Sequence, residues 1–313
     1  MKIYIIEKPQ KAEHLQEYLA KYGEVILLHK ETKSISDYDE LLSDAEEKIL
    51  AIAPGEIAWS VPNDYITKIP KLKGIVTKSS WGNYIDLAYC KKQGIAVGNS
   101  PGANAQSVAE YAVWQMLSLL RKLPLQLGAK FKVETNDASE GENASGKTVG
   151  ILGMGRIGRI IAKITEAMGM KITYWSRNKK DVPYEFVQLD ALLQKSDVLF
   201  KCWETCEETK PLLNAQNLQL LQKNAYFISV FGGIGFSGED DYILLDYAEQ
   251  GRIAGFSIEN EHAKDAKIKD SYKGNVFIPS ALAWHTKQTH EIYNRVMADT
   301  IIGMVKGREV NRL

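Results

Sequence analysis

Three glycines spaced as Gly-x-Gly-x-x-Gly are the residues of this chain whose pattern most directly indicates chemistry. They are, in order, Gly153, Gly155 and Gly158. After a strand, the first glycine permits a tight turn, the second lets a pyrophosphate approach the backbone, and the third lets a helix pack on the strand. The unpaired N–H groups and positive dipole at the start of that helix attract an anion. The pattern predicts a dinucleotide-binding loop that includes Arg156 and Ile157.

The segments around the loop fit this interpretation. The apolar run 149–152 predicts a buried strand, and 156–168 predicts a helix with isoleucines at four positions of one face, 157, 160, 161 and 164. A second strand over 171–175 completes a strand–helix–strand unit. Because all three elements occur at the expected spacing, dinucleotide binding is favoured over the alternative of a glycine-rich structural turn.

The end of the second strand indicates which dinucleotide binds. An NAD site usually carries an acidic residue there, which accepts hydrogen bonds from the ribose 2′-OH. Here Ser176 removes the carboxylate, while Arg177 and the nearby Lys179 supply cations that can pair with a 2′-phosphate. A solvated basic loop is the alternative. We predict that NADP(H) is preferred over NAD(H).

Composition limits the remaining possibilities. The 313 residues suit two domains, and 39 basic against 39 acidic residues provide no global field that attracts nucleic acid or a membrane surface. The chain contains no apolar run of membrane-spanning length. Three cysteines, Cys90, Cys202 and Cys206, have no paired spacing, which favours a reducing cytoplasm. Since no His or Cys cluster accompanies them, we predict no metal site.

The first hundred residues alternate strands and helices, which predicts a parallel sheet covered on both faces. Strands are expected at 2–6, 24–28, 49–52, 74–78 and 95–97, and helices at 11–21, 38–47 and 85–93. The segment Asn99-Ser100-Pro101-Gly102 then interrupts this alternation. A helix over 104–121 follows, with an apolar surface wider than one packing face needs. We expect it to form a homodimer contact, with burial between domains as the alternative.

The second half continues the alternation after a polar, loop-like segment at 133–146. Strands are expected at 197–200, 225–230, 253–258 and 275–278, and helices at 190–195, 214–222 and 240–250. A final helix over 287–304 is expected to return to the first domain. These elements predict a two-domain α/β fold, with one domain at 1–100 plus 285–313 and a dinucleotide-binding domain at 101–284.

A series of short motifs runs through the chain in a fixed order. They are NSPGAN at 99–104, SVAE at 107–110, the glycine loop, SDV at 196–198, ETK at 208–210 and GRIAG at 251–255. In this order they resemble the D-isomer-specific 2-hydroxyacid dehydrogenase family. The resemblance implies a Rossmann domain inserted into a flavodoxin-like substrate domain, NAD(P) in the interdomain cleft, and a homodimer formed through the 104–121 helix. It also implies that four further residues border the cofactor: Cys202, Val230, Glu259 and Ala283.

The resemblance also indicates where the family keeps its catalytic residues. An Arg holds the substrate carboxylate, a His carries the hydroxyl proton and a Glu tunes that His. In this chain Phe231 stands at the Arg position and Ala281 at the His position. Only Glu261 or Asp265 approximates the Glu. The chain is therefore expected to be a divergent member of the family.

The replacements have a chemical direction. Phe231 puts an apolar ring where the carboxylate clamp is expected, and Ser79-Ser80-Trp81 occupies the loop where the family offers backbone to that carboxylate. Trp284 adds another aromatic group. We therefore expect an aromatic-lined substrate cleft, whereas the alternative places these rings in the core.

A different residue could deliver the proton. His285 lies four residues after Ala281, at the expected start of the last helix, and histidine titrates near neutral pH. A surface or capping histidine is the alternative. Tyr84 and Lys287 are further candidate donors.

Two functions remain open at this point. The first is an NAD(P)H-dependent reductase of a substrate other than a simple 2-keto acid, such as an imine, an activated double bond or a carbonyl beside an aromatic group. The second is a catalytically inactive NAD(P)-binding sensor or scaffold. Both retain the glycine loop, and the sequence does not name the substrate.

Overall fold

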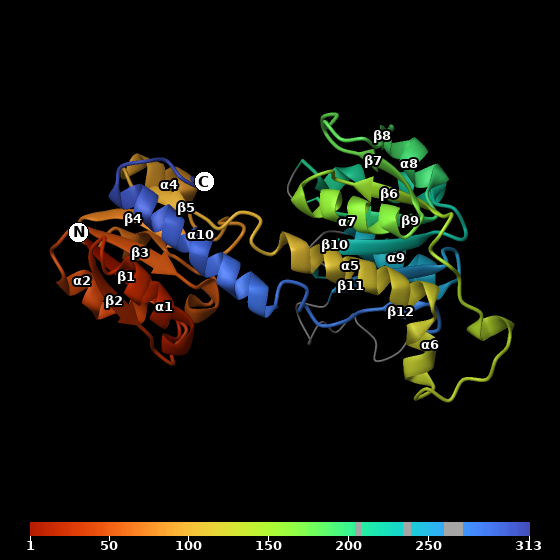
Figure 1. Ribbon diagram of the computed structural model, residues 1–313, viewed down its shortest axis with the longest axis horizontal. Helices are drawn as coiled ribbons and strands as arrows, with labels where there is room; N and C mark the ends of the chain where they lie inside the picture. The colour runs from red at the N-terminus through yellow and green to blue at the C-terminus, as the bar shows by residue number, and fades with distance from the viewer. Residues whose placement is uncertain (204–207, 234–238, 260–271) are drawn as a thin grey trace. The chain divides into compact units, whose positions relative to one another are not determined.

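The computed structural model describes residues 1–203, 208–233, 239–259 and 272–313, and the chain divides into two compact units. Unit 1 comprises Met1–Asn104 and Thr286–Leu313, and unit 2 comprises Ala105–His285. Each contains one parallel sheet with helices on both faces, so the α/β fold class is confirmed (Figure 1). The unit boundaries lie within a few residues of the expected domain limits.

The sheet of unit 1 has the strand order β2-β1-β3-β4-β5, which is the flavodoxin-like order. Its strands are β1 (Lys2–Ile6), β2 (Glu24–Leu28), β3 (Lys48–Ile52), β4 (Leu72–Thr77) and β5 (Ala96–Gly98). All neighbouring strands pair in parallel. Every residue of β3 is buried, as expected for a central strand covered on both faces.

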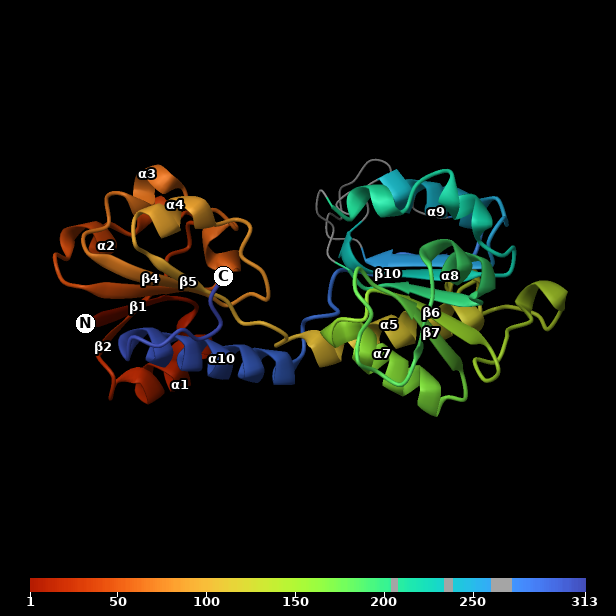
Figure 2. The same ribbon diagram turned by 90° about the horizontal axis from the view of Figure 1, so that it is seen from above.

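Two groups of helices cover this sheet (Figure 2). Helices α1 (Pro9–Leu19) and α10 (Lys287–Val305) pack together on one face, where Leu15 and Ile301 join the core. Helices α2 (Asp39–Ser43), α3 (Asn63–Ile66) and α4 (Leu87–Lys92) contribute to the core on the other face. The final helix thus packs on the sheet formed by the first hundred residues.

The sheet of unit 2 has the order β12-β11-β10-β9-β6-β7-β8. Its strands are β6 (Thr148–Leu152), β7 (Lys171–Trp175), β8 (Glu185–Phe186), β9 (Val198–Lys201), β10 (Tyr226–Gly233), β11 (Gly255–Glu259) and β12 (Val276–Phe277). All of the pairings are parallel. The strand order reverses between β6 and β9, which is the switch point where a doubly wound sheet binds its nucleotide.

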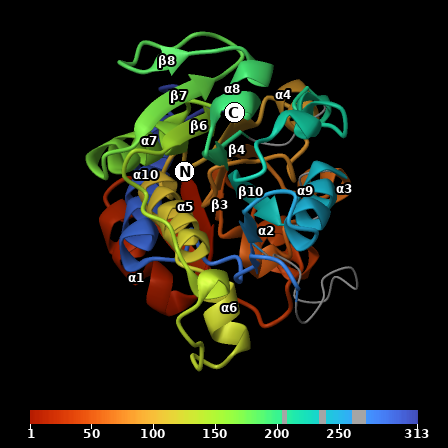
Figure 3. The same ribbon diagram turned by 90° about the vertical axis from the view of Figure 1, so that its right-hand side faces the viewer.

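Helices also cover both faces of this second sheet (Figure 3). Helices α5 (Ala105–Leu120) and α7 (Arg156–Ala167) enclose one core, and α8 (Leu189–Lys195) with α9 (Glu239–Glu249) enclose the other. The short helix α6 (Leu123–Gly128) follows α5.

Two predicted helices were wrong in extent, and side-chain hydrogen bonds explain both. The segment expected at 214–222 forms only a 3-10 turn at Asn217–Leu220, because the Asn214 side chain accepts from the backbone N–H of Gln216 (2.9 Å) and Asn217 (3.1 Å). The helix expected at 38–47 ends at Ser43. Asp44 next to it accepts a hydrogen bond from the Tyr4 hydroxyl (2.6 Å) instead of continuing the helix.

Candidate functional site

The glycine loop of unit 2 has the backbone that its sequence predicts. Gly153 follows β6 with a φ of +102°, a conformation that other residues rarely adopt, and its N–H donates to the Trp175 carbonyl (2.8 Å). A Cβ at Gly158 would lie 2.3 Å from the Gly153 carbonyl oxygen, so helix α7 can approach the strand only because this residue is glycine.

Gly155 has the opposite environment and supplies the test of whether a cofactor fits. A Cβ built on it would meet no protein atom within 4 Å, so the space beside this backbone is open. Gly155 is also the N-cap of α7 and no side chain caps that end, which leaves the first N–H groups available to an anion. Arg156 is exposed and Ile157 is half-buried beside the core. The loop therefore fits the pyrophosphate of a dinucleotide.

The residues after β9 lie beside the end of β6, on the other side of the switch point. The N–H of Cys202 donates to the Leu152 carbonyl (2.8 Å), and the ring of Trp203 meets Trp175 edge-on at 5.3 Å. Burial raises the pKa of the Cys202 thiol, so this sulfur is protonated at neutral pH. Cys206 lies outside the described residues.

The end of β7 carries the predicted 2′-phosphate residues, of which Arg177 and Lys179 lie on the surface. Ser176 is buried and its hydroxyl donates to the Asn178 carbonyl (2.7 Å), while Lys179 is exposed. Arg177 is exposed as well, and its Nη1 forms an ion pair with Oε2 of Glu208. The sequence did not reveal this partner, because the two residues are 31 positions apart.

The chain after β12 returns to the end of β11. Oε1 of Glu259 accepts a hydrogen bond from the backbone N–H of Ala283 (2.8 Å). Beside it, the Tyr111 hydroxyl donates to the carbonyl of Ser280, the neighbour of Ala281 (3.1 Å). Burial and the charge of Glu259 raise the pKa of Tyr111, so its hydroxyl stays protonated. Sequence analysis missed Tyr111 because its partner, Ser280, lies 169 positions away in the chain.

The remaining predicted residues of unit 2 are less closely grouped. Val230 is buried within β10, and Phe231 follows it in the same strand, where its side chain lies outside the described residues. Glu261 and Asp265 also lie outside them. His285 precedes α10, whose N-cap is Thr286 and which begins at Lys287 as predicted. Its exposed ring packs edge-on against Trp284 at 5.0 Å.

In unit 1, the segment 79–81 follows β4 and is held by several hydrogen bonds. The buried Ser79 hydroxyl oxygen accepts from the Trp81 N–H (3.2 Å), and the Ser80 hydroxyl donates to Oδ1 of Asn104 (2.9 Å). The Ser80 oxygen also lies 3.1 Å from the Tyr293 hydroxyl. Residues from both stretches of sequence that form unit 1, Asn104 and Tyr293, thus contact Ser80 and hold this segment in place.

The two other proton-donor candidates also lie in unit 1. The Tyr84 hydroxyl is hydrogen-bonded to Oγ1 of Thr77, and burial raises the pKa of Tyr84 well above its usual value. Lys287 is exposed at the first position of α10. Neither the pairing of Tyr84 nor the exposure of Lys287 singles it out as a donor.

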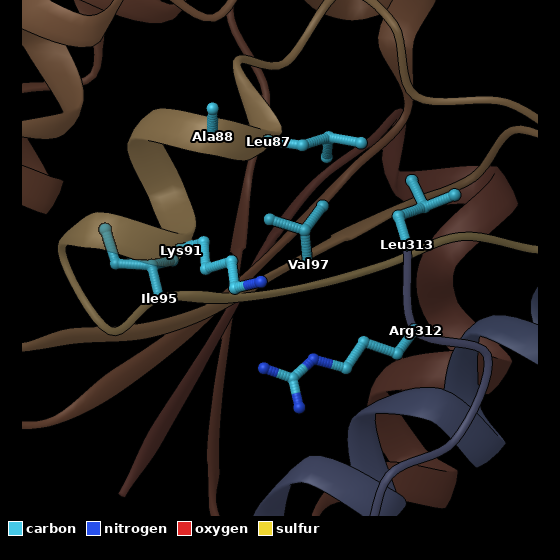
Figure 4. Close-up of a pocket in the computed structure, with 7 residues that line it drawn as sticks. All are labelled: Leu87, Ala88, Lys91, Ile95, Val97, Arg312 and Leu313. Atoms are coloured by element: carbon cyan, nitrogen blue, oxygen red, sulfur yellow. The ribbon is translucent and has the colours of Figure 1, made fainter.

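A hollow of about 430 Å³ lies elsewhere in unit 1, beside β5 (Figure 4). Seven residues line it: Leu87, Ala88, Lys91, Ile95, Val97, Arg312 and Leu313. None of these is a predicted cofactor or substrate residue. The candidate cofactor site therefore rests on the carboxyl end of the unit 2 sheet and not on this hollow.

Within the described ranges, no three or more His, Cys, Asp or Glu side chains are grouped so that they could hold a metal ion. None of the described helices combines the length and apolar character needed to cross a membrane.

Known proteins match this chain in sequence and in fold. The model of the D-isomer specific 2-hydroxyacid dehydrogenase NAD binding domain matches residues 113–268. Glyoxylate/hydroxypyruvate reductase HPR3 of Arabidopsis thaliana is 35% identical over 55% of each chain. Glyoxylate/hydroxypyruvate reductase A HPR2 of the same plant is 31% identical over 84% of this chain and 83% of its own. The solved structure of an acyclic imino acid reductase in complex with NADPH and D-Arg covers 100% of both chains with a TM-score of 0.82 at 23% identity.

The doubly wound sheet and its glycine loop define a dinucleotide-binding protein of the Rossmann class. The relatives narrow this class, and the chain belongs to the D-isomer-specific 2-hydroxyacid dehydrogenases, a family of NAD(P)-dependent oxidoreductases. The resemblance read from the motifs is thereby confirmed.

Proposed function

We propose that this protein is an NADP(H)-dependent reductase whose substrate is not a simple 2-keto acid. The observation that carries the proposal is a contrast within the chain. The cofactor loop is intact, with open space beside Gly155, whereas the motif resemblance assigns Phe231 and Ala281 to the positions of the family's Arg and His. A chain that keeps the cofactor site but changes the substrate groups is suited to the same hydride chemistry on a different substrate.

The cofactor preference rests on the end of β7. Ser176 carries no charge that repels a 2′-phosphate, and the guanidinium of Arg177 can form bidentate hydrogen bonds with that phosphate. The Glu208 contact does not remove this capacity, because both partners are largely exposed and such pairs contribute little stability. Lys179 adds a second cation. Bound NADPH would supply the hydride.

The substrate class follows from the missing clamp. Without an Arg at position 231, the chain lacks the family's charged fork for a carboxylate beside the reacting carbon. Reduction of an imine, an activated double bond or a carbonyl beside an aromatic group depends less on that fork. We assign cofactor binding to unit 2 and substrate contacts to segment 79–81 of unit 1, with Phe231 and Trp284 as further aromatic contacts. The whole chain shares its fold with an acyclic imino acid reductase, which is in keeping with an imine substrate.

We assign proton delivery to His285. Its imidazole is exposed and packed against Trp284, so it can exchange protons with solvent. Tyr84 and Lys287 are the alternatives. Burial raises the pKa of Tyr84, so its hydroxyl gives up a proton less readily than an exposed tyrosine does.

We further propose a homodimer formed through α5, and a cytoplasmic location. Large apolar side chains that are exposed in one copy gather on α5 and the segment after it: Trp114, Leu117, Leu125, Leu127 and Phe131. Such a patch is typical of a surface covered by a partner. The described cysteines, Cys90 and Cys202, are free thiols, as is usual in a reducing compartment.

Oxidation of NADPH against a panel of imines, enones, aromatic carbonyls and 2-keto acids tests the proposal. Steady turnover of a substrate outside the 2-keto acids supports it. The inactive sensor or scaffold is the alternative, and tight cofactor binding with no turnover on any substrate would favour that alternative.

A further inference from the structure

Two tryptophans stack at the carboxyl edge of the unit 1 sheet. Trp59 lies in the loop after β3 and Trp81 in the loop after β4, with ring centroids 5.0 Å apart and planes 19° from parallel. Tyr84 meets both rings edge-on, at 5.4 Å from Trp59 and 6.3 Å from Trp81. The sequence did not indicate this cluster, because Trp59 comes from a different loop than Trp81 and Tyr84.

The outer ring of the stack is unusually open. Trp59 is 44% exposed, although Trp81 covers one side of it, so a substantial part of its aromatic surface faces solvent. Trp81 itself is only partly exposed. A large ring left in water forgoes the stabilisation that burial would give, so burial alone does not account for this placement.

The backbone under Trp59 is strained. Ala58 and Trp59 have φ values of +50° and +56°, so two consecutive residues other than glycine adopt the left-handed region. The Trp59 N–H donates to the Pro54 carbonyl (3.0 Å), and the Ser60 N–H to the Ile57 carbonyl (3.1 Å), which hold this turn. Such strain, kept by surrounding contacts, is found most often where a loop must present a side chain to a ligand.

The charged groups at this edge are already paired. Nζ of Lys78 lies 2.7 Å from Oε2 of Glu7, and both side chains are buried. Oε2 of Glu56, in the same loop as Trp59, lies 3.3 Å from Nδ1 of His29. The buried Lys78–Glu7 ion pair and the contact between Glu56 and His29 leave the stacked rings as the prominent recognition surface, which favours an uncharged ligand group over an ion.

We propose that Trp59 binds a flat, uncharged ring of the substrate by continuing the stack that Trp81 begins. Offset stacking favours a planar ring over a puckered ring of equal size, so the site selects for shape as well as for apolar character. This inference rests on the proposed function only in assigning the edge of unit 1 to substrate. It identifies Trp59 as a residue that determines specificity.

The test measures binding, so it does not depend on turnover. The full chain, labelled with ¹⁵N in its tryptophans and saturated with NADP⁺, is titrated with benzamide and, separately, with cyclohexanecarboxamide. These probes differ mainly in ring planarity. We expect benzamide to shift the Trp59 indole N–H signal saturably and to bind at least about fivefold more tightly than the puckered amide. The signal is assigned with Trp59→Phe.

Variants separate stacking from general apolar contact. Trp59→Ala is expected to abolish the preference for benzamide, and Trp59→Phe to retain part of it. Tyr18→Ala removes another exposed ring of unit 1, on α1, and should leave the preference unchanged. A melting curve for each variant shows whether it is folded.

Three results would overturn the inference: equal affinity for the two amides, no saturable shift at Trp59, or tighter binding of benzylammonium than of benzamide. The proposed reductase can fail separately. If benzamide binds at Trp59 but no substrate is reduced, the reductase proposal fails and the ring site stands. If substrates are reduced with no preference for planar rings, only the ring site fails.

Discussion

Arg177 and Glu208 form an ion pair on the surface of unit 2, with Nη1 of the guanidinium facing Oε2 of the carboxylate. The pair joins the end of β7 to the segment after β9, on the side of the switch point where the 2′-phosphate of NADP(H) is proposed to bind. In the proposed complex, Glu208 would compete with the 2′-phosphate for Arg177.

Removing the guanidinium should discriminate between the two cofactors. We expect Arg177→Ala to weaken NADPH binding by about 1–3 kcal/mol, the range for a lost charge-assisted hydrogen bond, and to leave NADH nearly unchanged. Fluorescence titration of both cofactors measures this. Equal affinities for NADPH and NADH in the parent protein would contradict the assignment.

Removing the competing carboxylate should have the opposite effect. We expect Glu208→Gln to tighten NADPH binding by about 0.2–1 kcal/mol, since exposed ion pairs are worth that much, without changing NADH. The same titration applies. An unchanged NADPH affinity would show that breaking the Arg177–Glu208 ion pair takes no measurable free energy.

Two glycines of the loop offer a matched comparison. Gly155→Ala adds a Cβ that meets no protein atom, so the melting temperature should hold while the cofactor affinity falls. Gly158→Ala adds a Cβ 2.3 Å from the Gly153 oxygen, so it should lower the melting temperature. Thermal unfolding and cofactor titration of both variants check this. Unaltered cofactor binding in Gly155→Ala would argue against pyrophosphate at this position.

Much of the fold was predictable because most of its strands are short apolar runs flanked by polar residues or glycine. The strands 2–6, 24–28 and 171–175 were predicted with their observed limits. Helix α6 was missed, since Leu125 and Leu127 are exposed and give it no buried periodic face. The predicted helix at 214–222 failed because propensity does not register side-chain hydrogen bonds to the backbone.

The site was predictable only where neighbours in sequence form it. The glycine loop is contiguous, so its geometry followed from its residue types. The pairs Arg177–Glu208 and Trp59–Trp81 each join two loops, and only the folded sheet brings their members together. The contact between Tyr111 and Ser280 spans 169 positions and was missed for the same reason.

The proposed dimer makes α5 sensitive to charge. Leu117 is 38% exposed on α5, and we expect Leu117→Glu to shift the protein from dimer to monomer, because a carboxylate buried in an apolar contact is costly. Leu87→Glu, at a similarly exposed leucine of α4, is the control. Sedimentation velocity reports the state. A parent protein that sediments as a monomer would remove the proposal.

The assignment of proton delivery to His285 predicts a variant with lower turnover but unchanged cofactor affinity. His285→Ala should lower turnover at least about a hundredfold, the low end for general acid catalysis, and leave NADPH affinity unchanged. Steady-state kinetics with a substrate found in the panel measures it. Unchanged turnover would exclude His285 and leave Tyr84, Lys287 or water as the donor.

The most direct test of the account is the rate of NADPH oxidation with glyoxylate and hydroxypyruvate beside that with imines and aromatic carbonyls. With Phe231 and Ala281 at the family's Arg and His positions, as proposed, both orientation of a 2-keto acid and proton transfer to it should be impaired. The account predicts steady turnover with a substrate of the second group and at least a hundredfold less with the two keto acids. Turnover of glyoxylate or hydroxypyruvate at about 10 per second, an ordinary enzymatic rate, would contradict it.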